Sequence, residues 1–303
     1  MSAPKHADRI FCSVIVPTLG DEAILSRCLR SIDMAKVALP PKTVETILVL
    51  QGEVDDGFEK YLRSRGRLEV SSVRGLSHAR NIGIGLARGD FLLFLDDDAV
   101  LAEDSLQVLY RSVSEDRVSA LCGKVVEIDT GEPYVPDWPE PKGDRLTWRN
   151  FQLFIGLCHV VHREAFDRCG LYDERLGVGS VYPAGEETDL FFRLLQRGES
   201  VRYVREMIVY HPSAKQFTLE KTFAYAFGNG ALHAKYAWGL LPRHYWSFIR
   251  IILVNCVKIA LGLCTRLWWD AVAWAKVTGN IRGYCEFIRR EKVGCRHNNG
   301  VAW

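Results

Sequence analysis

Five apolar residues in succession, 91–95, run directly into three aspartates, Asp96, Asp97 and Asp98. An apolar stretch of this length is typical of a β-strand that is buried on both faces, as in a parallel sheet covered by helices. Adjacent carboxylates repel one another and resist burial unless a cation or hydrogen-bond donors receive them. The sequence therefore predicts a central strand that ends at a charged opening.

The residues before this strand alternate short apolar runs with amphipathic stretches, which is the pattern of an α/β fold with crossover helices. Three earlier strands are expected, over residues 11–17, 43–50 and 67–73. In open α/β sheets, ligands bind at the carboxyl ends of the strands. The three aspartates therefore lie where such a sheet would hold its ligand.

Helical periodicity between the strands predicts which side chains face the sheet. The helix that begins near residue 21 is expected to turn five residues inward, namely Ile24, Leu25, Cys28, Leu29 and Ile32. The helix that ends before Gly89 is expected to turn another five inward, namely Leu76, Ala79, Ile82, Gly83 and Leu86. Both faces are interpretations from spacing alone.

A helix over residues 102–113 and a strand over 119–128 are expected after the aspartates. The next segment, residues 130–144, contains four prolines and is typical of a surface lid or connector. Trp138 and Trp148 have aromatic faces that suit a sugar ring, and core packing explains them equally well.

A second group of acids, Glu186, Glu187 and Asp189, opens the stretch GEETDLFFR. Helical spacing there places an apolar face on one side, so the acids are expected to project from the first turn of a helix. Acids at a helix N-terminus also complement the helix dipole, and this structural role is the alternative. Farther along, His211 ends an expected strand. Its two possible roles are that of a metal ligand and that of a structural residue.

The formal net charge of +2 conceals an asymmetry along the chain. From Arg243 onward there are ten basic and three acidic residues, so this tail carries +7 and the remainder −5. The apolar stretch 245–277 is interrupted by charges at Arg250, Lys258 and Arg266, which argues against a spanning helix. An amphipathic helix in the plane of an anionic membrane surface is favoured, and packing on the catalytic domain or in a dimer is the alternative.

Composition excludes several classes of protein. The nine cysteines show no C-x-x-C pair and no regular spacing, which argues against a zinc site or a disulfide framework. No secretory signal is evident near the start, so a cytoplasmic location is expected. The basic tail has no recognised nucleic-acid motif, and no nucleic-acid partner is expected.

The triple aspartate admits two kinds of chemistry. Asp96 and Asp98, two residues apart at a strand end, suit a divalent cation that also binds substrate phosphates. The pattern D-x-D-x-[TV] is also the shape of a phosphatase loop in the haloacid dehalogenase superfamily, with Asp96 as the nucleophile. That loop normally follows the first strand of its domain, whereas about ninety residues precede it in this chain. The cation site is therefore favoured.

Three motifs occur in one order: SVIVPTLGDEAILSRCLRSI, then RGLSHARNIGIGLARGDFLLFLDDDAV, then GEETDLFFRLLQRG. With them the chain resembles an inverting family 2 glycosyltransferase of the GT-A fold, from about Ser13 to about His211. The resemblance implies an α/β fold with a Rossmann-like, mostly parallel central sheet and flanking helices, followed by a C-terminal helical, amphipathic extension. The expected domains are a polar tail (1–10), a catalytic domain (11–215, with halves 11–100 and 101–215) and a basic helical region (216–303).

The resemblance also implies roles for individual residues. The cation, Mn²⁺ or Mg²⁺, would be bound by Asp98, Asp96 and His211. The base that deprotonates the acceptor would be Glu187, with Glu186 and Asp189 as alternatives. The residues expected to bind the nucleotide sugar are Pro17, Thr18, Gln51, Arg80, Asn81, Asp96 and Asp97.

One position departs from the family pattern. Members commonly carry an aspartate near the end of the second strand that reads uracil, whereas this chain has Leu50 and Gln51. An amide both donates and accepts, so Gln51 retains the capacity to pair with a base edge. The departure weakens the expectation of a uridine donor.

The expected function is transfer of a sugar from a nucleoside-diphosphate sugar to an acceptor hydroxyl of a glycan or lipid-linked oligosaccharide in cell-surface polysaccharide biosynthesis. The expected place is the inner face of the cell membrane, as a peripheral protein. Two alternatives stay open, the phosphatase and a catalytically inactive module that binds nucleotide sugar.

Overall fold

The computed structural model of the chain describes residues 10–114, 118–134, 143–212, 218–237, 249–250, 252–260 and 271–297. The chain divides into two compact units, Met1–Tyr172 with Glu187–Ala214 and Asp173–Glu186 with Lys215–Trp303. The first unit contains the expected catalytic domain except for 173–186 and residue 215, which group with the C-terminal helices.

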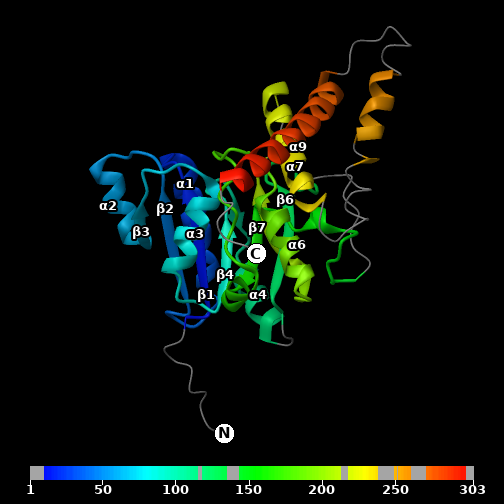
Figure 1. Cartoon of the computed structure of the whole chain (residues 1–303). Helices are drawn as coiled ribbons and strands as arrows, with labels where there is room; N and C mark the ends of the chain where they lie inside the picture. The colour runs from blue at the N-terminus through cyan, green and yellow to red at the C-terminus, as the bar shows by residue number, and fades with distance from the viewer. Residues whose placement is uncertain are drawn as a thin grey trace. The chain divides into compact units, whose positions relative to one another are not determined.

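The described part of the first unit is built around a sheet of eight strands in the order β3-β2-β1-β4-β7-β6-β8-β5 (Figure 1). Parallel pairs join β3, β2, β1 and β4, and β6 to β8, whereas β4–β7, β7–β6 and β8–β5 are antiparallel. The strand bounds are Cys12–Thr18 (β1), Val44–Leu50 (β2), Arg67–Val70 (β3), Phe91–Leu95 (β4), Val100–Leu101 (β5), Ala120–Glu127 (β6), Cys158–His162 (β7) and Val201–His211 (β8). The expected α/β fold is confirmed, with a mixed sheet.

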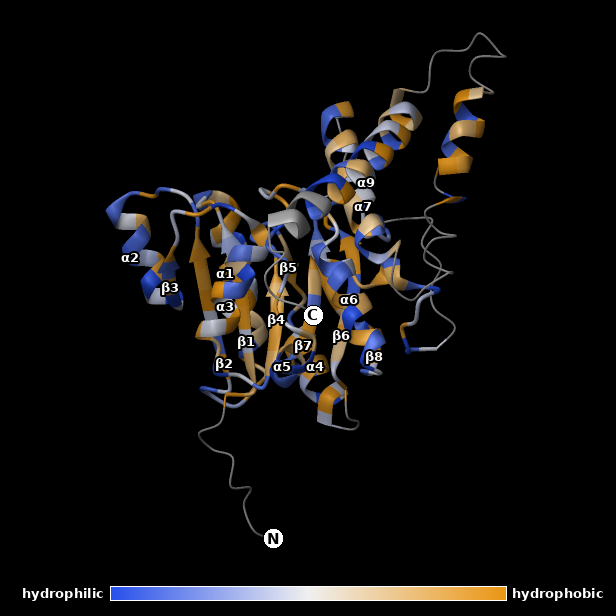
Figure 2. Cartoon of the chain, in the orientation of Figure 1, coloured by the Kyte–Doolittle hydropathy of each residue, from blue (hydrophilic) through white to orange (hydrophobic). Residues whose placement is uncertain are grey.

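Helices flank this sheet and mix hydrophilic and hydrophobic residues, whereas the central strands are mostly hydrophobic (Figure 2). Their bounds are Glu22–Lys36 (α1), Asp56–Arg65 (α2), Leu76–Leu86 (α3), Ser105–Ser114 (α4), Arg163–Cys169 (α5) and Glu186–Gln196 (α6), with a 3₁₀ turn η1 at Phe151–Leu153. The N-terminus of α1 is capped by Asp21, whose carboxylate accepts from the Ile24 amide, a contact that contributes about 1 kcal/mol. Asp55 caps α2 in the same way.

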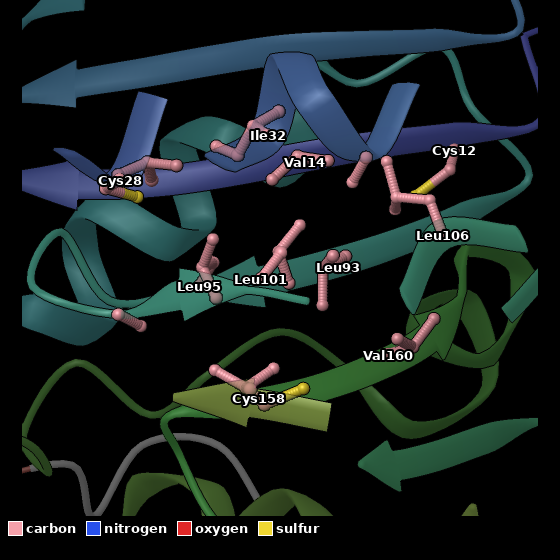
Figure 3. Packing of buried hydrophobic residues seen from close by; sticks show 14 of the residues in the cluster. Cys12, Val14, Cys28, Ile32, Leu93, Leu95, Leu101, Leu106, Cys158 and Val160 are labelled. Carbon is pink, nitrogen blue, oxygen red and sulfur yellow. The ribbon is translucent and has the colours of Figure 1, made fainter. Parts of the chain in front are cut away.

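The central strands form the core because their side chains are apolar on both faces. On β4, all residues from Leu92 to Leu95 have no exposed surface, which confirms the expectation for the run before the aspartates. Figure 3 shows Leu93 and Leu95 between side chains of β1 and α1 on one side and of β7 on the other. Cys28 and Cys158 fill apolar positions in this core.

Two predicted helix faces are partly wrong. On α1, Leu25, Cys28, Leu29 and Ile32 are buried as expected, but Ile24 is 36% exposed because it lies in the first turn, where residues 21–24 are all exposed.

On α3 the buried set is Ser77, Ala79, Arg80, Gly83 and Ile84, whereas Leu76, Ile82 and Leu86 are only partly buried. A Cβ at Gly83 would collide with Ile15 of β1, so the backbones of α3 and β1 approach closely there. This close contact turns Arg80 into the core, where periodicity of apolar residues predicts a leucine or isoleucine.

In the second unit, α7 (Leu219–Ala237) and α9 (Ala271–His297) pack together at glycines. A Cβ at Gly283 would collide with the carbonyl oxygen of Phe227, and one at Gly279 would lie 2.7 Å from that of Phe223. Ion pairs join Asp173 to Lys235 and Arg175 to Glu291 within this unit.

The predicted amphipathic stretch 245–277 lies partly outside the described residues. Of its described part, residues 249–250 and 252–260 are helical, and α9 begins at Ala271. None of the helices that the structure describes combines the length and the hydropathy needed to span a bilayer.

Candidate functional site

The strand directions bring residues that are distant in sequence to one edge of the sheet. Strands β1, β2 and β4 run parallel, so their carboxyl ends, at Thr18, Leu50 and Leu95, share that edge. Strand β8 is parallel to β6, and two antiparallel pairings through β7 relate β6 to β4. The end of β8, at His211, therefore lies at the same edge as Asp96.

Asp96, Asp98 and His211 converge at this edge. One potential ligand atom from each lies within 4.8 Å of the others. The Nε2 atom of His211 lies 2.9 Å from Oδ1 of Asp98, and its Nδ1 lies 2.7 Å from the carbonyl oxygen of Pro212. Since a carbonyl oxygen only accepts, Nδ1 donates there, which fixes the orientation of the ring.

The charges of this cluster affect one another. Burial alone would lower the pKa of His211, but the hydrogen bond to Asp98 and the charge of that carboxylate outweigh burial and raise it. Burial alone would raise the pKa of Asp98, and the hydrogen bond from His211 lowers it instead. The contact with Asp98 thus favours a positive charge on the imidazole beside the acids when no cation is bound.

Arg80 holds Asp96 from inside the protein. The side chain of Arg80 is fully buried, and its Nη2 lies 3.2 Å from Oδ1 of Asp96 and donates to the carbonyl oxygen of Gly156 at 3.0 Å. Its guanidinium also lies over the ring of Tyr172, 5.6 Å from the centroid. A buried charge needs such partners, so Arg80 orients Asp96.

Asn81 connects α3 to the backbone of Tyr172 through two hydrogen bonds. Its Nδ2 donates to the carbonyl oxygen of Tyr172 at 3.0 Å, and the Tyr172 amide donates to its Oδ1 at 3.0 Å. The hydroxyl of Tyr172 lies 2.5 Å from Nε2 of the buried His159. The predicted contacts of Arg80 and Asn81 with a nucleotide stay predictions, and both side chains are engaged within the protein.

Asp97 points away from the cluster, toward β1. The Thr18 hydroxyl donates to its Oδ2 at 2.6 Å and accepts from the Gly20 amide at 3.0 Å. Burial raises the pKa of Asp97, and the hydrogen bond from Thr18 opposes that rise only in part. Pro17, which precedes Thr18, is buried in β1 and pairs with Val49 of β2.

Gln51 uses its amide to fasten a loop. Its Nε2 donates to the carbonyl oxygens of Val73 and Gly75, at 2.6 and 3.1 Å, and the Gly75 amide donates to its Oε1 at 3.4 Å. The side chain is buried. Both hydrogens of the amide are therefore committed to the loop between β3 and α3, and its predicted contact with a base stays a prediction.

The acids of α6 differ from one another in burial. Asp189 is fully buried, and its Oδ2 accepts from Nε of Arg193, one helical turn away, at 2.9 Å. Glu186 is buried and Glu187 is half-buried. After burial and the Cys158 sulfur, the charge of Glu187 contributes to the raised pKa of Cys122 on β6, which places this carboxylate near the sheet.

Two residues of the cluster's surroundings were not expected from the sequence. The Nη2 atom of Arg27, on α1, donates to the carbonyl oxygen of Asp98 at 3.4 Å. The ring of Tyr134 packs edge-on against His211, with centroids 5.1 Å apart and planes at 77°. The sequence signal for Tyr134 is its place in the proline-rich segment 130–144.

Those tryptophans are placed as follows. Trp138 lies outside the described residues. Trp148 packs on Phe192 of α6, with ring centroids 5.0 Å apart. The contact that the structure shows for Trp148 is thus with the protein.

Comparison with known proteins establishes the family. The family model described as Glycosyl transferase family 2 matches residues 13–170. The chain belongs to the family 2 glycosyltransferases. This match gives no support to the alternative interpretation of the aspartates as a phosphatase loop.

One curated relative is the succinoglycan biosynthesis protein ExoM of Rhizobium meliloti (strain 1021), to which the chain is 27% identical over 181 residues, covering 57% of each chain. Three further curated glycosyltransferases, from Streptococcus pneumoniae serotype 4 and Bacillus subtilis, are matched over only 31–40% of their own length. The chain thus spans well under half of those relatives.

Solved structures show the GT-A type of fold. The mannosyltransferase PcManGT from Pyrobaculum calidifontis, in complex with GDP-Man and Mn²⁺, is similar with a TM-score of 0.61 at 15% identity, over 95% of this chain and 90% of that one. S. aureus TarS 1-349 in complex with UDP-GlcNAc is similar with a TM-score of 0.55 at 15% identity, over 94% and 92%. At such identities the likeness is one of fold.

Proposed function

We propose that the chain transfers a sugar from a nucleoside-diphosphate sugar to an acceptor hydroxyl, with inversion at the anomeric carbon. The observation that carries this proposal is the convergence of Asp96, Asp98 and His211 at the carboxyl edge of the sheet. The donors named for the similar structures, UDP-GlcNAc and GDP-Man, support a nucleotide sugar in this position.

The residues of the cluster fit a divalent cation. Two carboxylates and an imidazole are a donor set that Mn²⁺ accepts, and Mg²⁺ is held by one or two carboxylates together with phosphates. Asp96, Asp98 and His211 would hold the ion, which when bound stabilises the charge that develops on a leaving diphosphate. The buried Arg80 keeps Asp96 in place for this role, since it fixes one carboxylate oxygen from behind.

Glu187 is proposed as the base. Its carboxylate would take the proton of the acceptor hydroxyl as that oxygen bonds to the anomeric carbon and the bond to the diphosphate oxygen breaks. Half-buried at the first turn of α6, it combines access with a fixed place near the sheet. Glu186 and Asp189 remain the alternatives, and Asp189 is engaged by Arg193.

The acceptor is proposed to be a growing glycan of a surface polysaccharide, carried by lipid. The name of the succinoglycan biosynthesis relative supports this class. We further propose attachment to the cytoplasmic face of the membrane through α9, where Trp274 and Ile281 are 45% and 48% exposed beside the exposed Arg282. Exposed tryptophan together with basic residues suits anionic headgroups.

Thermal unfolding with a panel of nucleotide sugars and Mn²⁺ tests the proposal. A ligand at about a hundred times its Kd stabilises the folded state by about 2.7 kcal/mol, so the matching donor raises Tm by several degrees. Asp98→Asn should abolish this shift, whereas Asp104→Asn, which changes an exposed aspartate a few residues away, should retain it. An unchanged shift in Asp98→Asn would contradict the assigned site.

Turnover separates the transferase from an inactive binding module. The transferase releases the nucleoside diphosphate when an acceptor extract is added to the bound donor. Donor binding without release across acceptor extracts would favour the inactive module. Co-sedimentation with anionic vesicles tests the membrane proposal, and Trp274→Ser combined with Ile281→Ser should reduce it.

A further inference from the structure

A short reversal of the chain after β6 places Tyr134 beside the cation site. The Glu127 amide donates to the carbonyl oxygen of Glu132 at 2.8 Å, and the Tyr134 amide donates to that of Val125 at 3.2 Å. Val126 and Pro133 form an antiparallel bridge in the same turn. The chain therefore runs back along the end of β6, whose opposite edge is paired with β8.

This placement brings the ring of Tyr134 against His211. The two rings meet edge to face at 77°, with centroids 5.1 Å apart. His211 pairs with Glu127 across β6 and β8, so the turn and the histidine belong to the same part of the sheet. With Asp98 at one ring nitrogen and Pro212 at the other, the Tyr134 contact fixes the remaining freedom of the imidazole, its tilt.

The hydroxyl of Tyr134 is close to the acids yet bonded to neither. It makes no hydrogen bond to any residue in the described part of the chain, and the side chain is only half-buried. Asp98 and Asp96 are near enough to act on it electrostatically. A phenol packed on His211 is a hydrogen-bond donor within electrostatic reach of the acids.

We propose that Tyr134 is a positioning residue for His211 and that its hydroxyl donates a hydrogen bond to a phosphate oxygen of the bound nucleotide sugar. The second part rests on the proposed function, because it requires a diphosphate at Asp96 and Asp98. The positioning of His211 requires only the cation. The two parts of the proposal can therefore be measured separately.

Calorimetric titration with Mn²⁺ alone, and then with inorganic pyrophosphate in the presence of Mn²⁺, tests both parts on the full chain. Tyr134→Phe keeps the ring, so the Kd for Mn²⁺ should stay within about twofold, while the Kd for pyrophosphate should rise about tenfold, as for one lost hydrogen bond to a charged group. Tyr134→Ala removes the ring as well, so the Kd for Mn²⁺ should rise about tenfold, which is typical of the loss of a partner that orients a metal ligand.

The matched control is Tyr110→Ala, which removes another half-exposed ring with an edge contact. Its partner Phe11 precedes β1, at the amino ends of β1 and β4 and therefore opposite the edge that carries the acids. It should leave both constants unchanged. Heteronuclear spectra of the imidazole report its tilt independently of turnover, and the His211 ring signals should move in Tyr134→Ala and be restored in Tyr134→Phe.

Wild-type affinity for pyrophosphate in Tyr134→Phe would overturn the assignment of the hydroxyl. Wild-type affinity for Mn²⁺ in Tyr134→Ala, with unchanged His211 signals, would overturn the positioning role. A wild-type chain that binds Mn²⁺ and pyrophosphate as described but transfers no sugar would contradict the proposed function and leave Tyr134 where it is placed.

Discussion

The acids after β4 and the acids at the start of α6 share one design feature. In each cluster an arginine holds one carboxylate: Arg80 lies 3.2 Å from Asp96, and Arg193 lies 2.9 Å from Asp189. Arg80 comes from another element and is fully buried, whereas Arg193 is one turn along the same helix and is 18% exposed. The first ion pair therefore ties two elements together, whereas the second lies within one helix, and Arg193 reaches the end of α5 only through carbonyl oxygens.

Each cluster also has a carboxylate that no arginine of these pairs holds, Asp98 in the first and Glu187 in the second. The two clusters differ in the groups around this carboxylate. Asp98 faces His211 and, with Asp96, forms a convergent set that suits a cation. Glu187 is not part of any such set among the described residues. A convergent set favours metal binding, and a single half-buried carboxylate favours proton transfer.

The largest effect is expected at Glu187. Glu187→Gln should keep donor binding within about threefold and lower the transfer rate by about 10²- to 10⁴-fold, the usual contribution of general base catalysis. Single-turnover rates with saturating donor measure this, with Glu103→Gln, an exposed glutamate before α4, as the control. A full rate in Glu187→Gln would move the base to Glu186 or Asp189.

Stability should separate the two arginine pairs. Asp96→Ala leaves the buried Arg80 without its carboxylate and should lower the free energy of unfolding by about 3–5 kcal/mol. Asp189→Ala leaves Arg193 with the carbonyl oxygens of Cys169 and Gly170, so a smaller loss of about 1.5–3 kcal/mol is expected. Urea unfolding of both variants checks the order, and equal losses would remove the distinction between the pairs.

The smallest effect is a pH dependence that only the first cluster should show, measured without metal. The pKa of His211 is raised above 6.5 and that of Asp98 is lowered below 3.8 by their mutual contact, with burial opposing both shifts. Because the pKa of His211 is raised in the folded state, its contact with Asp98 stabilises the protein below pH 6.5, and this stability is lost as the pH rises through the folded-state pKa. The lowered Asp98 value contributes stability above pH 3.8 that is lost as pH falls through the folded pKa.

His211→Gln should therefore cost more stability at pH 5.5 than at pH 8.5, as measured by urea unfolding. Arg193→Gln should cost the same at both values, because a guanidinium keeps its charge over this range. An equal cost of His211→Gln at the two pH values would contradict the ion pair with Asp98.

The strands of the first half were predictable, because buried parallel strands appear in the sequence as continuous apolar runs. The edge that carries the acids was predictable because the aspartates directly follow such a run. The burial of Arg80 was not, since its partner Asp96 is 16 residues away and apolar periodicity treats arginine as surface. Asp173, which groups with the C-terminal helices, is bonded to Lys235, 62 residues later, and no local pattern predicts this contact. Tyr134 lies in a segment without periodicity, so only the fold reveals its contact with His211.

A crystal of the chain with Mn²⁺ and a nucleoside diphosphate tests the central claim most directly, through the anomalous scattering of manganese. The predicted result is a peak coordinated by Asp98 together with Asp96, His211 or both, and by oxygens of the diphosphate. A peak elsewhere, or no peak with the diphosphate bound away from these side chains, would contradict the assignment of this edge of the sheet as the site of sugar transfer.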